Sequence, residues 1–304
     1  MLSSSYHVRK RQTSVGLLFA ITVVLLSILL AACGTNTTVG ATTTTTTKPA
    51  IAPPNDLITS GVLTVGSDTT YPPQEYIDPK TTKAAGFDVD LITAVAARMG
   101  LKANVVTTGF STIIDSLTAK RFDVVISAVS ITAERQKKVD FVPYFNAGES
   151  LLVQKGNPKN LKTTSDLCGL NVGVQTGTIE QDDLTAANKD CLKNGKPQIK
   201  VTVLQDQTAV VQLLATNRVV ATFQDSPVTD YYIKQNPGQF EVGGSVINAG
   251  LEGIVVRKGD SSMMTAIQAA FKALKDDGTY TNLINKWGLT TGAISFIDRK
   301  MIYA

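Results

Sequence analysis

From residue 62 onwards, short apolar runs alternate with longer segments in which apolar residues recur at helical spacing. Residues 62–66 form a short valine-rich run that predicts a buried strand. In residues 87–99, Leu91, Val95 and Met99 share one helical face and Gly100 follows, which predicts an amphipathic helix. The same patterns predict further strands at residues 104–106, 122–126, 170–174, 200–204 and 219–223, and further helices at residues 113–117, 178–188, 208–216, 228–235, 263–274 and 280–287. This alternation predicts an α/β fold of parallel βαβ units with helices on both faces.

One part of this pattern repeats along the chain. Ile113, Leu117 and Arg121 align with Val210, Leu214 and Arg218 at a constant offset of 97 residues, and both stretches read as helix, tight turn and buried strand. Two similar lobes of about 100 residues each, a usual domain size, would explain the repeat. Chance similarity between two βαβ units is the alternative.

The first 56 residues have a different composition. A basic cluster at residues 9–11 precedes 16 uncharged residues (15–30), and a spanning helix needs about 20 apolar residues. Leu30-Ala31-Ala32-Cys33 resembles the bacterial lipobox, in which the chain is cut before a cysteine that is then acylated. We therefore expect a lipoprotein signal peptide at 1–32 and a lipidated Cys33. An ordinary signal or membrane anchor with an incidental cysteine is the alternative.

The signal and its lipid would place the protein outside the cytoplasm, anchored to the cell membrane and either periplasmic or on the cell surface. Residues 33–56 are rich in threonine and proline and have too few apolar residues to form a core. They predict a flexible tether between the lipid and a folded body.

Charge and histidine content exclude several functions. The 304 residues carry 29 Lys plus Arg against 25 Asp plus Glu, a net charge of +4, and no basic block follows the first dozen residues. Cleavage before Cys33 would leave 26 basic and 25 acidic residues, so we expect no nucleic-acid partner. The only histidine is His7, within the signal segment, and we expect no metal, no cofactor and no histidine-based catalysis.

Cys168 and Cys191 remain once Cys33 is assigned to the lipid. An exported chain meets oxidising surroundings, which predicts a disulfide between these two cysteines. Two free buried thiols are the alternative.

Polar residues follow the predicted strands, where open α/β sheets bind their ligands. In chain order they are Asp68, Tyr71, Ser127, Ser130, Arg135, Thr178 and Asp225. Across a cleft between two lobes, one arginine and two aspartates offer a cation for a carboxylate and an anion for an ammonium group. This set complements a free α-amino acid.

The same segments resemble a known family. Residues 86–91, Gly-Phe-Asp-Val-Asp-Leu, resemble the signature of bacterial extracellular solute-binding proteins of family 3, which serve ATP-binding-cassette (ABC) importers of polar amino acids. Residues 68–73, 130–135, 175–178 and 276–280 are similar to further motifs of the family in the expected order, so that the resemblance covers residues 57–288.

The resemblance implies the type II periplasmic-binding-protein architecture, in which two Rossmann-like lobes are joined by two crossover strands and close on a ligand between them. The crossovers would lie near residues 148–153 and 248–255. Lobe 1 would comprise residues 57–148 plus 252–290, and lobe 2 residues 149–251. Residues 291–304 would form a tail without an assigned role.

The resemblance also assigns roles to the charged residues. Arg135 matches the arginine that holds the α-carboxylate, helped by the backbone N–H groups of Ser130 and Thr178. Asp225 matches the acceptor of the α-ammonium group, beside the Ser130 hydroxyl. The alternatives are a surface arginine at a helix start, and a helix N-cap before Pro227.

The remaining ligand contacts follow in the same way. Tyr71 and Phe110 match two aromatic walls of the site, although either could be a core residue. Asp68 matches a contact to the end of the ligand side chain, or else caps a turn, and Ser127 would add a hydroxyl.

Asp88 and Asp90 belong to the signature, but we interpret them as structural residues that open and cap a helix. Gln74, Ala128 and Ile179 depart from the usual family residues. These departures leave the backbone donors intact and put the side-chain specificity in doubt.

The leading hypothesis is a lipid-anchored, monomeric receptor, not an enzyme. It would bind a polar L-amino acid by hinge closure, leaning towards arginine, lysine or glutamine, and deliver it to an ABC permease. An exported enzyme on the same scaffold, resembling a cyclohexadienyl dehydratase or a peptidoglycan lyase, is the alternative, with Glu149 and Glu180 as available carboxyl groups. A receptor sensor domain is a third class that needs a spanning helix after Trp287, and the sequence shows none there.

Overall fold

The structure, a computed structural model, describes residues 51–295. Its strands are β1 (Val62–Ser67), β2 (Thr70–Tyr71), β3 (Glu75–Ile77), β4 (Ala84–Ala85), β5 (Lys102–Thr107), β6 (Val124–Val125), β7 (Val139–Gln154), β8 (Asn171–Gln175), β9 (Lys200–Leu204), β10 (Ala221–Asp225) and β11 (Phe240–Arg257). Its α-helices are α1 (Phe87–Arg98), α2 (Ile113–Thr118), α3 (Ala133–Gln136), α4 (Ile179–Lys193), α5 (Gln207–Ala215), α6 (Ser226–Gln235), α7 (Ser261–Asp276) and α8 (Thr279–Trp287). Short 3₁₀ helices are η1 (Phe110–Thr112), η2 (Thr164–Leu167) and η3 (Thr290–Gly292). Every strand and helix expected from the apolar patterns is present, with shifted ends.

The expected signal peptide, Cys33 and most of the tether lie outside the described residues, as does the end of the tail. The last part of the expected tether is not free: Ile51 packs against the lobe 1 core, and Asp56 pairs with Arg257. Within residues 51–295 there is no helix with the length and apolar character needed to span a bilayer.

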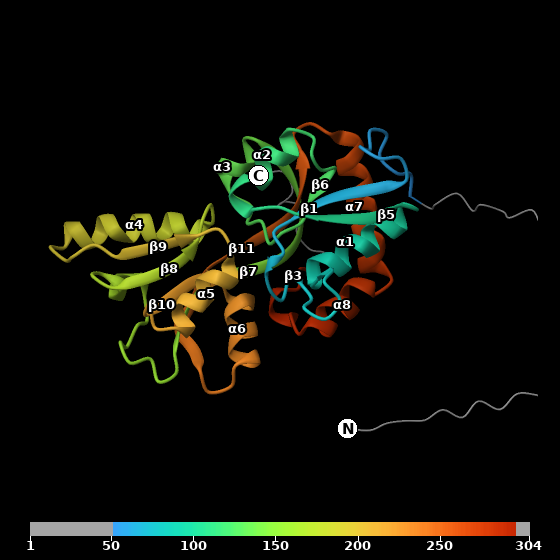
Figure 1. The fold of residues 1–304 in the computed structure, drawn as a ribbon. Helices are drawn as coiled ribbons and strands as arrows, with labels where there is room; N and C mark the ends of the chain where they lie inside the picture. Colours follow the sequence, from blue (N-terminus) through green and yellow to red (C-terminus); the bar gives the residue numbers. More distant parts are fainter. Residues whose placement is uncertain (1–50, 296–304) are drawn as a thin grey trace, which may run out of the picture. The chain divides into compact units, whose positions relative to one another are not determined.

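The main sheet has eight strands in the order β5-β1-β6-β11-β7-β10-β8-β9. β1 pairs in parallel with β5 and β6, and β8 pairs in parallel with β9 and β10. Between these two parallel groups lie β11 and β7, which run antiparallel to each other and to the strands beside them. Figure 1 shows β7 and β11 passing from one group of helices and strands to the other. The predicted fold class, two Rossmann-like halves with two crossover strands, is confirmed.

The buried apolar residues divide in the same way. The largest cluster draws on residues 63–147 and 254–289, around α1, α7 and α8. Two further clusters draw only on residues 151–240, around α4 and α5. A small cluster of Tyr71, Ala128 and Val228 is the one that joins both sides among the clusters of the described residues. We keep the names lobe 1 and lobe 2 for the two predicted parts, whose boundaries stay a prediction.

The internal repeat corresponds to two similar units. α2 leads through a tight turn into β6, and α5 leads through a tight turn into β10. Lys120 and Asn217 occupy equivalent places in these turns, and both are left-handed, with φ of 58° and 57°. Left-handed backbone at equivalent non-glycine positions is uncommon, and it supports a shared helix–turn–strand unit.

The start of α1 shows why Gly86 precedes the aspartates. Gly86 is the N-cap residue, with φ of 133°, and a Cβ there would lie 2.1 Å from the Gln74 carbonyl oxygen. Only glycine adopts this backbone without a clash. No side chain caps the helix. The prediction that Asp88 and Asp90 cap α1 was therefore wrong, although both lie in its first turn.

Both aspartates instead connect α1 to other elements. The Asp88 carboxylate accepts hydrogen bonds from the Ala128 N–H at 3.0 Å and the Tyr144 hydroxyl at 2.6 Å. Asp90 accepts one from the indole N–H of Trp287 at 2.8 Å. Asp88 thus supports the loop after β6, where Ala128 has φ of 46°, and this loop carries part of the candidate site.

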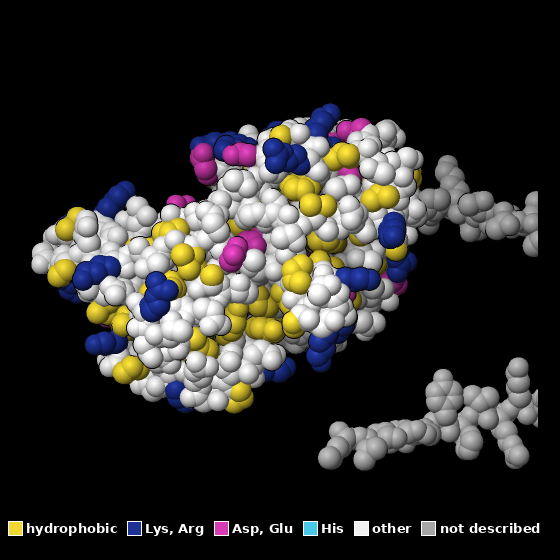
Figure 2. All heavy atoms as spheres, viewed as in Figure 1, with side chains coloured by type: hydrophobic (Ala, Val, Ile, Leu, Met, Phe, Trp, Pro, Cys, Tyr) yellow, Lys and Arg dark blue, Asp and Glu magenta, His cyan; other side chains and the backbone are white. Residues whose placement is uncertain are grey.

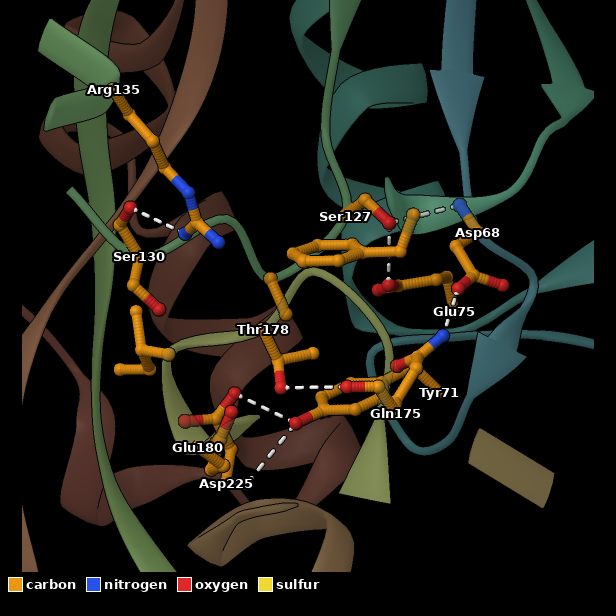
Figure 3. Close-up of a pocket in the computed structure, with 13 residues that line it drawn as sticks. Asp68, Tyr71, Glu75, Ser127, Ser130, Arg135, Gln175, Thr178, Glu180 and Asp225 are labelled. Carbon is orange, nitrogen blue, oxygen red and sulfur yellow. Dashed lines mark hydrogen bonds between the residues drawn. The ribbon is translucent and has the colours of Figure 1, made fainter. Parts of the chain in front are cut away.

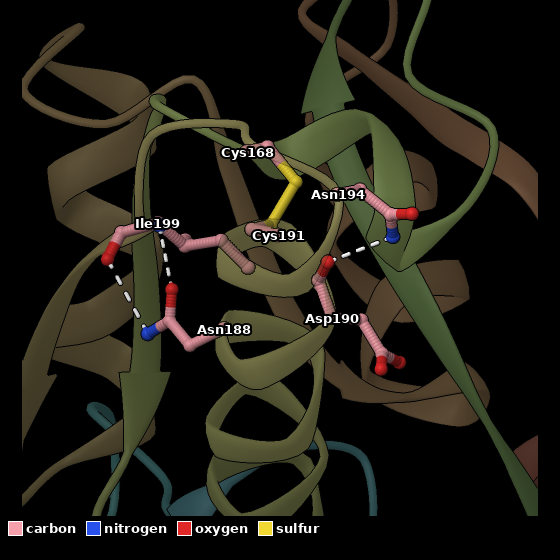
Figure 4. Close-up of a disulfide and its surroundings, with 6 residues drawn as sticks. All are labelled: Cys168, Asn188, Asp190, Cys191, Asn194 and Ile199. Carbon is pink, nitrogen blue, oxygen red and sulfur yellow. Dashed lines mark hydrogen bonds between the residues drawn. A yellow bond between two sulfur atoms is a disulfide. The ribbon is translucent and has the colours of Figure 1, made fainter.

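Cys168 and Cys191 form the predicted disulfide, with a Cα–Cα distance of 5.7 Å. The bond joins the segment after η2 to the last turns of α4, as Figure 4 shows. Next to it, Asn188 accepts a hydrogen bond from the Ile199 N–H at 2.6 Å. These contacts fix the far end of α4, whose other end reaches the candidate site.

Candidate functional site

A cavity lies where the strand ends of both lobes meet, with an empty volume of about 270 Å³ that is partly open to solvent. Its lining is shown in Figure 3. The lining residues are Asp68, Tyr71, Glu75, Phe110, Ser127, Ala128, Ser130, Arg135, Gln175, Thr178, Ile179, Glu180 and Asp225. The cavity therefore brings together all eight ligand-binding residues expected from the sequence.

Arg135, from α3, lies at one end of the cavity. Its guanidinium donates hydrogen bonds to the carbonyl oxygens of Ser130 at 2.9 Å and Gly177 at 3.1 Å. The same group lies 5.4 Å from the centre of the Phe110 ring, a cation–π distance. Gly177 belongs to lobe 2, so that Arg135 connects the two lobes in this arrangement. The guanidinium is half-buried and held in place, and it is not a free surface side chain.

Thr178 is the N-cap residue of α4, directly after Gly177. Its hydroxyl accepts a hydrogen bond from the Gln181 N–H and donates one to the Gln175 carbonyl. Thr178, Ile179 and Glu180 all line the cavity, so the positive N-terminal end of α4 lies at the cavity. The free N–H groups at such a helix end favour an anion such as a carboxylate.

Asp225 is the last residue of β10 and is 6% exposed. Its side chain makes no capping hydrogen bond to α6, which argues against the alternative of a simple N-cap. Instead it accepts a hydrogen bond from the Tyr71 hydroxyl at 2.9 Å, while the Asp225 N–H donates back to that hydroxyl at 3.1 Å. Tyr71 lies in lobe 1, so this pair also joins the lobes.

Tyr71 therefore does more than form an aromatic wall. Its ring packs in the small cluster with Ala128 and Val228, and its hydroxyl holds Asp225 across the cavity. Tyr71 is thus a packed core side chain that also lines the cavity, and its contact with a ligand stays a prediction.

Asp68 lies at the other end of the cavity, at the carboxyl end of β1. It accepts hydrogen bonds from the Thr70 hydroxyl at 2.9 Å and from the side-chain amide of Gln175, a lobe 2 residue. Ser127 accepts a hydrogen bond from the Asp68 N–H at 2.9 Å, and its own hydroxyl donates to Glu75 at 2.8 Å. The Ser127 proton is thus already used within the protein, which leaves Ser127 as an acceptor.

Sequence reasoning missed Glu75 and Gln175 as lining residues and considered Glu180 only as a possible enzyme acid. Glu75 comes from the three-residue strand β3, which has no periodicity that marks an inward side chain. Glu180 lies in the first turn of α4, a place where an acid usually favours the helix dipole in solvent. Both are buried here, with 0% and 2% of their surface exposed.

The lining carries four carboxyl groups, Asp68, Glu75, Glu180 and Asp225, against one guanidinium. Burial raises the pKa of Asp68 to about 6 and the pKa of Asp225 to about 6. Burial and the nearby Asp225 hold the pKa of Glu180 well above its usual range. A cationic group inside the cavity would lower all these pKa values, because it would favour the charged form of each carboxyl.

Glu75 also belongs to a second set of buried carboxyl groups, in lobe 1. Glu75, Asp88 and Glu252 are at most 1% exposed, and each has one side-chain oxygen without a hydrogen-bond partner among the described residues. Tyr144 donates to Asp88 and, at 3.4 Å, to Glu252, and the Gln74 amide also donates to Glu252. Burial and the Asp88 charge hold the pKa of Glu75 well above its usual range, and burial does the same for Glu252.

These features define the class of protein: two α/β halves joined by two crossover strands, with a cavity lined by charged groups between them. Residues 63–290 match the family described as bacterial extracellular solute-binding proteins, family 3. The chain belongs to this family.

Relatives of known function cover most of the chain. The L-cystine-binding protein TcyJ of Escherichia coli (strain K12) is 32% identical over 234 residues, which cover 77% of this chain and 85% of TcyJ. The arginine-binding protein ArgT of Corynebacterium glutamicum (strain ATCC 13032) is 31% identical over 245 residues, covering 79% of each protein.

Solved structures with the same fold include proteins with a bound ligand. An ancestral arginine-binding protein bound to arginine is 37% identical, with a TM-score of 0.70, and covers 75% of this chain and 98% of its own. The ancestral amino acid-binding protein AncCDT-1, described as a precursor of cyclohexadienyl dehydratase, is 35% identical, with a TM-score of 0.65, and covers 75% of this chain and 95% of its own.

Proposed function

We propose that this protein is the receptor of an ABC importer for a free polar L-amino acid, with a preference for a basic side chain such as that of arginine or lysine. The observation that carries the proposal is the charge of the cavity, where one guanidinium and an excess of carboxyl groups face the same space. Arg135 would take the α-carboxylate with the N-terminus of α4, and Asp225 would take the α-ammonium group. Asp68 would take the end of the side chain.

The charges favour a cationic ligand over a neutral one. A zwitterionic head group uses Arg135 and Asp225 and leaves Asp68 in a buried place without a charge partner. A guanidinium or ammonium at the end of the side chain would supply that partner and displace the Gln175 amide from Asp68. A neutral amide, as in glutamine, can donate a hydrogen bond to Asp68 but brings no charge. We therefore expect arginine and lysine to bind more tightly than glutamine.

Relatives support an amino acid as the ligand, since they include proteins named for binding cystine, arginine and histidine. The exported-enzyme alternative would need Glu149 or Glu180 as an acid or base. Prephenate, the substrate class of that alternative, carries two carboxylates. Its two carboxylates would enter a cavity in which Arg135 is the one cationic lining group and the other ionisable lining groups include four carboxyls, so the second carboxylate would have no positive partner.

Delivery by a membrane-anchored monomer completes the proposal. The lipobox-like segment before Cys33 would anchor the receptor outside the cytoplasm, and the tether at 33–56 would let it reach an ABC permease. Intact-mass analysis of the protein purified from its membrane would show an acylated cysteine as the first residue. An unprocessed N-terminus would contradict the anchor without affecting the proposed ligand.

A thermal-shift screen tests the ligand. The purified body is first unfolded and refolded to remove any bound amino acid, and then heated with each of the twenty L-amino acids and with L-cystine. We expect L-arginine and L-lysine to raise the melting temperature most, in proportion to the logarithm of their concentration. An unchanged melting temperature with every amino acid would contradict the proposal.

Substitutions test the site. We expect Arg135→Ala and Asp225→Ala each to weaken arginine binding by several kcal/mol, because each leaves a charged ligand group without its partner in a buried place. Calorimetric titration measures the affinity, and circular dichroism checks that the fold is kept. Unchanged affinity in both variants would refute the proposed site.

A further inference from the structure

Beyond the head-group contacts, lobe 2 carries a group of carboxyls around Asp225. Glu149 on β7 pairs directly opposite Asp225 on β10 in the antiparallel register. Glu149 is 2% exposed, although like charges directly opposite each other on neighbouring strands repel. The side-chain amide of Asn248, on β11, donates to Asp183 at 2.7 Å and lies 3.5 Å from both Glu149 carboxyl oxygens. The β7 and β11 strands therefore hold a carboxyl group close to the ammonium site.

Glu180 is the member of this group that lines the cavity. It is 2% exposed, and its Oε1 atom has no hydrogen-bond partner among the described residues. Figure 3 shows its carboxyl group drawn together with that of Asp225, which is its strongest charged neighbour. A buried oxygen without a partner is costly, and this one borders the space that a ligand would fill.

The charged and titratable groups around Glu180 are mostly acidic. Asp225 comes from β10 and Glu149 from β7, and both raise its pKa. Tyr71, from β2, places a neutral hydroxyl nearby, and the polar side chain of Thr178, the N-cap residue of the same helix, partly offsets the effect of burial. Asp182 and Asp183 follow on α4, and Asp225 also raises the pKa of Glu252 on β11.

Arg135, from α3, is the one guanidinium that acts on this group among the described residues. Its N–H groups already bind the Ser130 and Gly177 carbonyl oxygens. One cation that already has two carbonyl partners therefore acts on both Glu180 and Asp225, and Glu149 adds a third carboxyl group to them. Ionising all three at once would be strongly unfavourable without a further positive charge.

We propose that Glu180 is a second carboxyl partner of the ligand's ammonium group, and that it gives up a proton to solvent when that cation binds. The inference rests on the proposed function, because it requires a ligand with an ammonium group at Asp225. In the free protein Glu180 is a neutral acid. In the complex it is a carboxylate facing the ammonium group, and the proton passes to the buffer, so that charge and atoms balance.

This exchange makes binding depend on pH. Burial and Asp225 keep the pKa of Glu180 high in the free protein, and a bound cation lowers it. Between these two pKa values binding releases a proton, so that affinity increases with pH by about tenfold per pH unit at full release. Acidification would weaken binding and promote release of the ligand.

Calorimetric titration in buffers of different ionisation enthalpy counts the protons released. We would titrate the refolded wild-type protein with L-arginine and with L-glutamine at about pH 6.5 and about pH 7.5. L-Glutamine has the same ammonium group but no side-chain cation. Protons that it releases therefore come from the carboxyls near the ammonium group, such as Glu180, and not from Asp68. We expect wild type to release protons with both ligands.

The Glu180→Gln variant keeps the size of the side chain and removes its proton. We expect it to release about one proton fewer than wild type and to bind with a correspondingly flatter pH profile. Glu241→Gln is the matched control: Glu241 binds Lys155 on the surface of lobe 2, away from the cavity, and this variant should release as many protons as wild type.

The outcomes separate the two claims. Ligand binding by wild type without proton release, or equal release by wild type and Glu180→Gln, would overturn the inference and leave the proposed function intact. If neither ligand binds to wild type, the proposed function fails and this inference fails with it.

Discussion

Glu75, Asp88 and Glu252 lie together in lobe 1, and no basic side chain of the described residues contacts them. Three ionised carboxyls could not share such a place, because burial without a positive partner is far too unfavourable. Burial holds the pKa values of Glu75 and Glu252 well above their usual range and raises that of Asp88 to about 6. A proton kept on Glu75 and on Glu252 would supply a donor within this set.

This arrangement predicts that Glu252→Gln protects the protein at alkaline pH. A pKa raised by folding contributes stability below the unfolded pKa of 4.5 and loses it as pH rises through the folded pKa. Glutamine cannot ionise and can still accept the hydrogen bond from Gln74. We therefore expect the variant to lose less unfolding free energy than wild type between about pH 5 and about pH 9, as measured by urea denaturation.

Glu241→Gln is the control for this prediction. Folding lowers the pKa of the half-buried Glu241 through the Gly156 N–H and Lys155, so its small contribution to stability is lost on the acid side. The alkaline part of the plot of unfolding free energy against pH should then be the same for Glu241→Gln as for wild type. An equally steep alkaline loss in Glu252→Gln would show that Glu252 is already ionised in the native protein.

At the scale of single residues, the sequence predicted correctly most of the residues that line the cavity. It did not predict the hydrogen bonds that these residues make with one another. Arg135, Asp225 and Asp68 were predicted because they follow strands, and the ends of parallel strands meet at one edge of a sheet. The family resemblance pointed to the same three residues. The Tyr71–Asp225 contact and the buried Glu75 and Glu180 depend on how two lobes meet. No local pattern contains that information.

Helix α4 shows how an element links the core of lobe 2 to the ligand. Its N-terminus lies at the cavity, and its last turns are joined to the segment after η2 by the Cys168–Cys191 disulfide. The bond closes a loop with a sequence separation of 23 residues that contains β8 and most of α4. The disulfide therefore limits the freedom of this whole unit in the unfolded chain.

Replacing both cysteines by serine should lower the unfolding free energy by about 3 kcal/mol, the chain-entropy value for a loop of this length. Urea denaturation of the oxidised wild type and of the double variant measures the difference. Alkylation and mass spectrometry without reductant must first show that wild type has no free thiol at either position. A difference below about 0.5 kcal/mol would contradict this role of the bond.

Element positions were largely predictable because apolar periodicity and stop signals are local. The ends of the elements were less predictable. Helix α4 continues beyond the expected residue 188 to Lys193, because Ala187 and Cys191 are buried and extend its apolar face. The capping role of Asp88 and Asp90 was wrong because tertiary partners, the Ala128 N–H and the Trp287 indole, compete for these carboxylates.

At the scale of the whole molecule, an aromatic contact outside the cavity lining connects the two lobes. Tyr76 on β3 lies 6.3 Å from Tyr231 on α6, measured between ring centres, and 6.2 Å from Trp287 on α8. In Figure 2, hydrophobic side chains gather over α6 and the neighbouring α8 and β3. Tyr231 is a residue of the predicted lobe 2, so the Tyr76–Tyr231 pair joins the two predicted lobes, and we expect it to be lost when they open.

Tyr76→Ala should weaken ligand binding without touching the cavity. An aromatic pair is worth about 0.5–1.5 kcal/mol, which corresponds to roughly 2- to 12-fold in affinity. Trp287 is the only tryptophan, so its emission should change on binding of L-arginine in wild type, and the change should shrink in the variant. Ile77→Ala, at an exposed position on the same strand, should leave both quantities unchanged. Equal affinities of Tyr76→Ala and wild type would exclude a role for this contact in closure.

The central claim is that both lobes close on an amino acid whose charges Arg135 and Asp225 neutralise. Calorimetric titration of the refolded, ligand-free protein with L-arginine tests it most directly. The account predicts saturable binding of one arginine per protein, and at least a hundredfold weaker binding by Asp225→Asn, the loss of a buried charge pair. Absence of heat with L-arginine, L-lysine and L-glutamine, or equal affinity of Asp225→Asn and wild type, would contradict it.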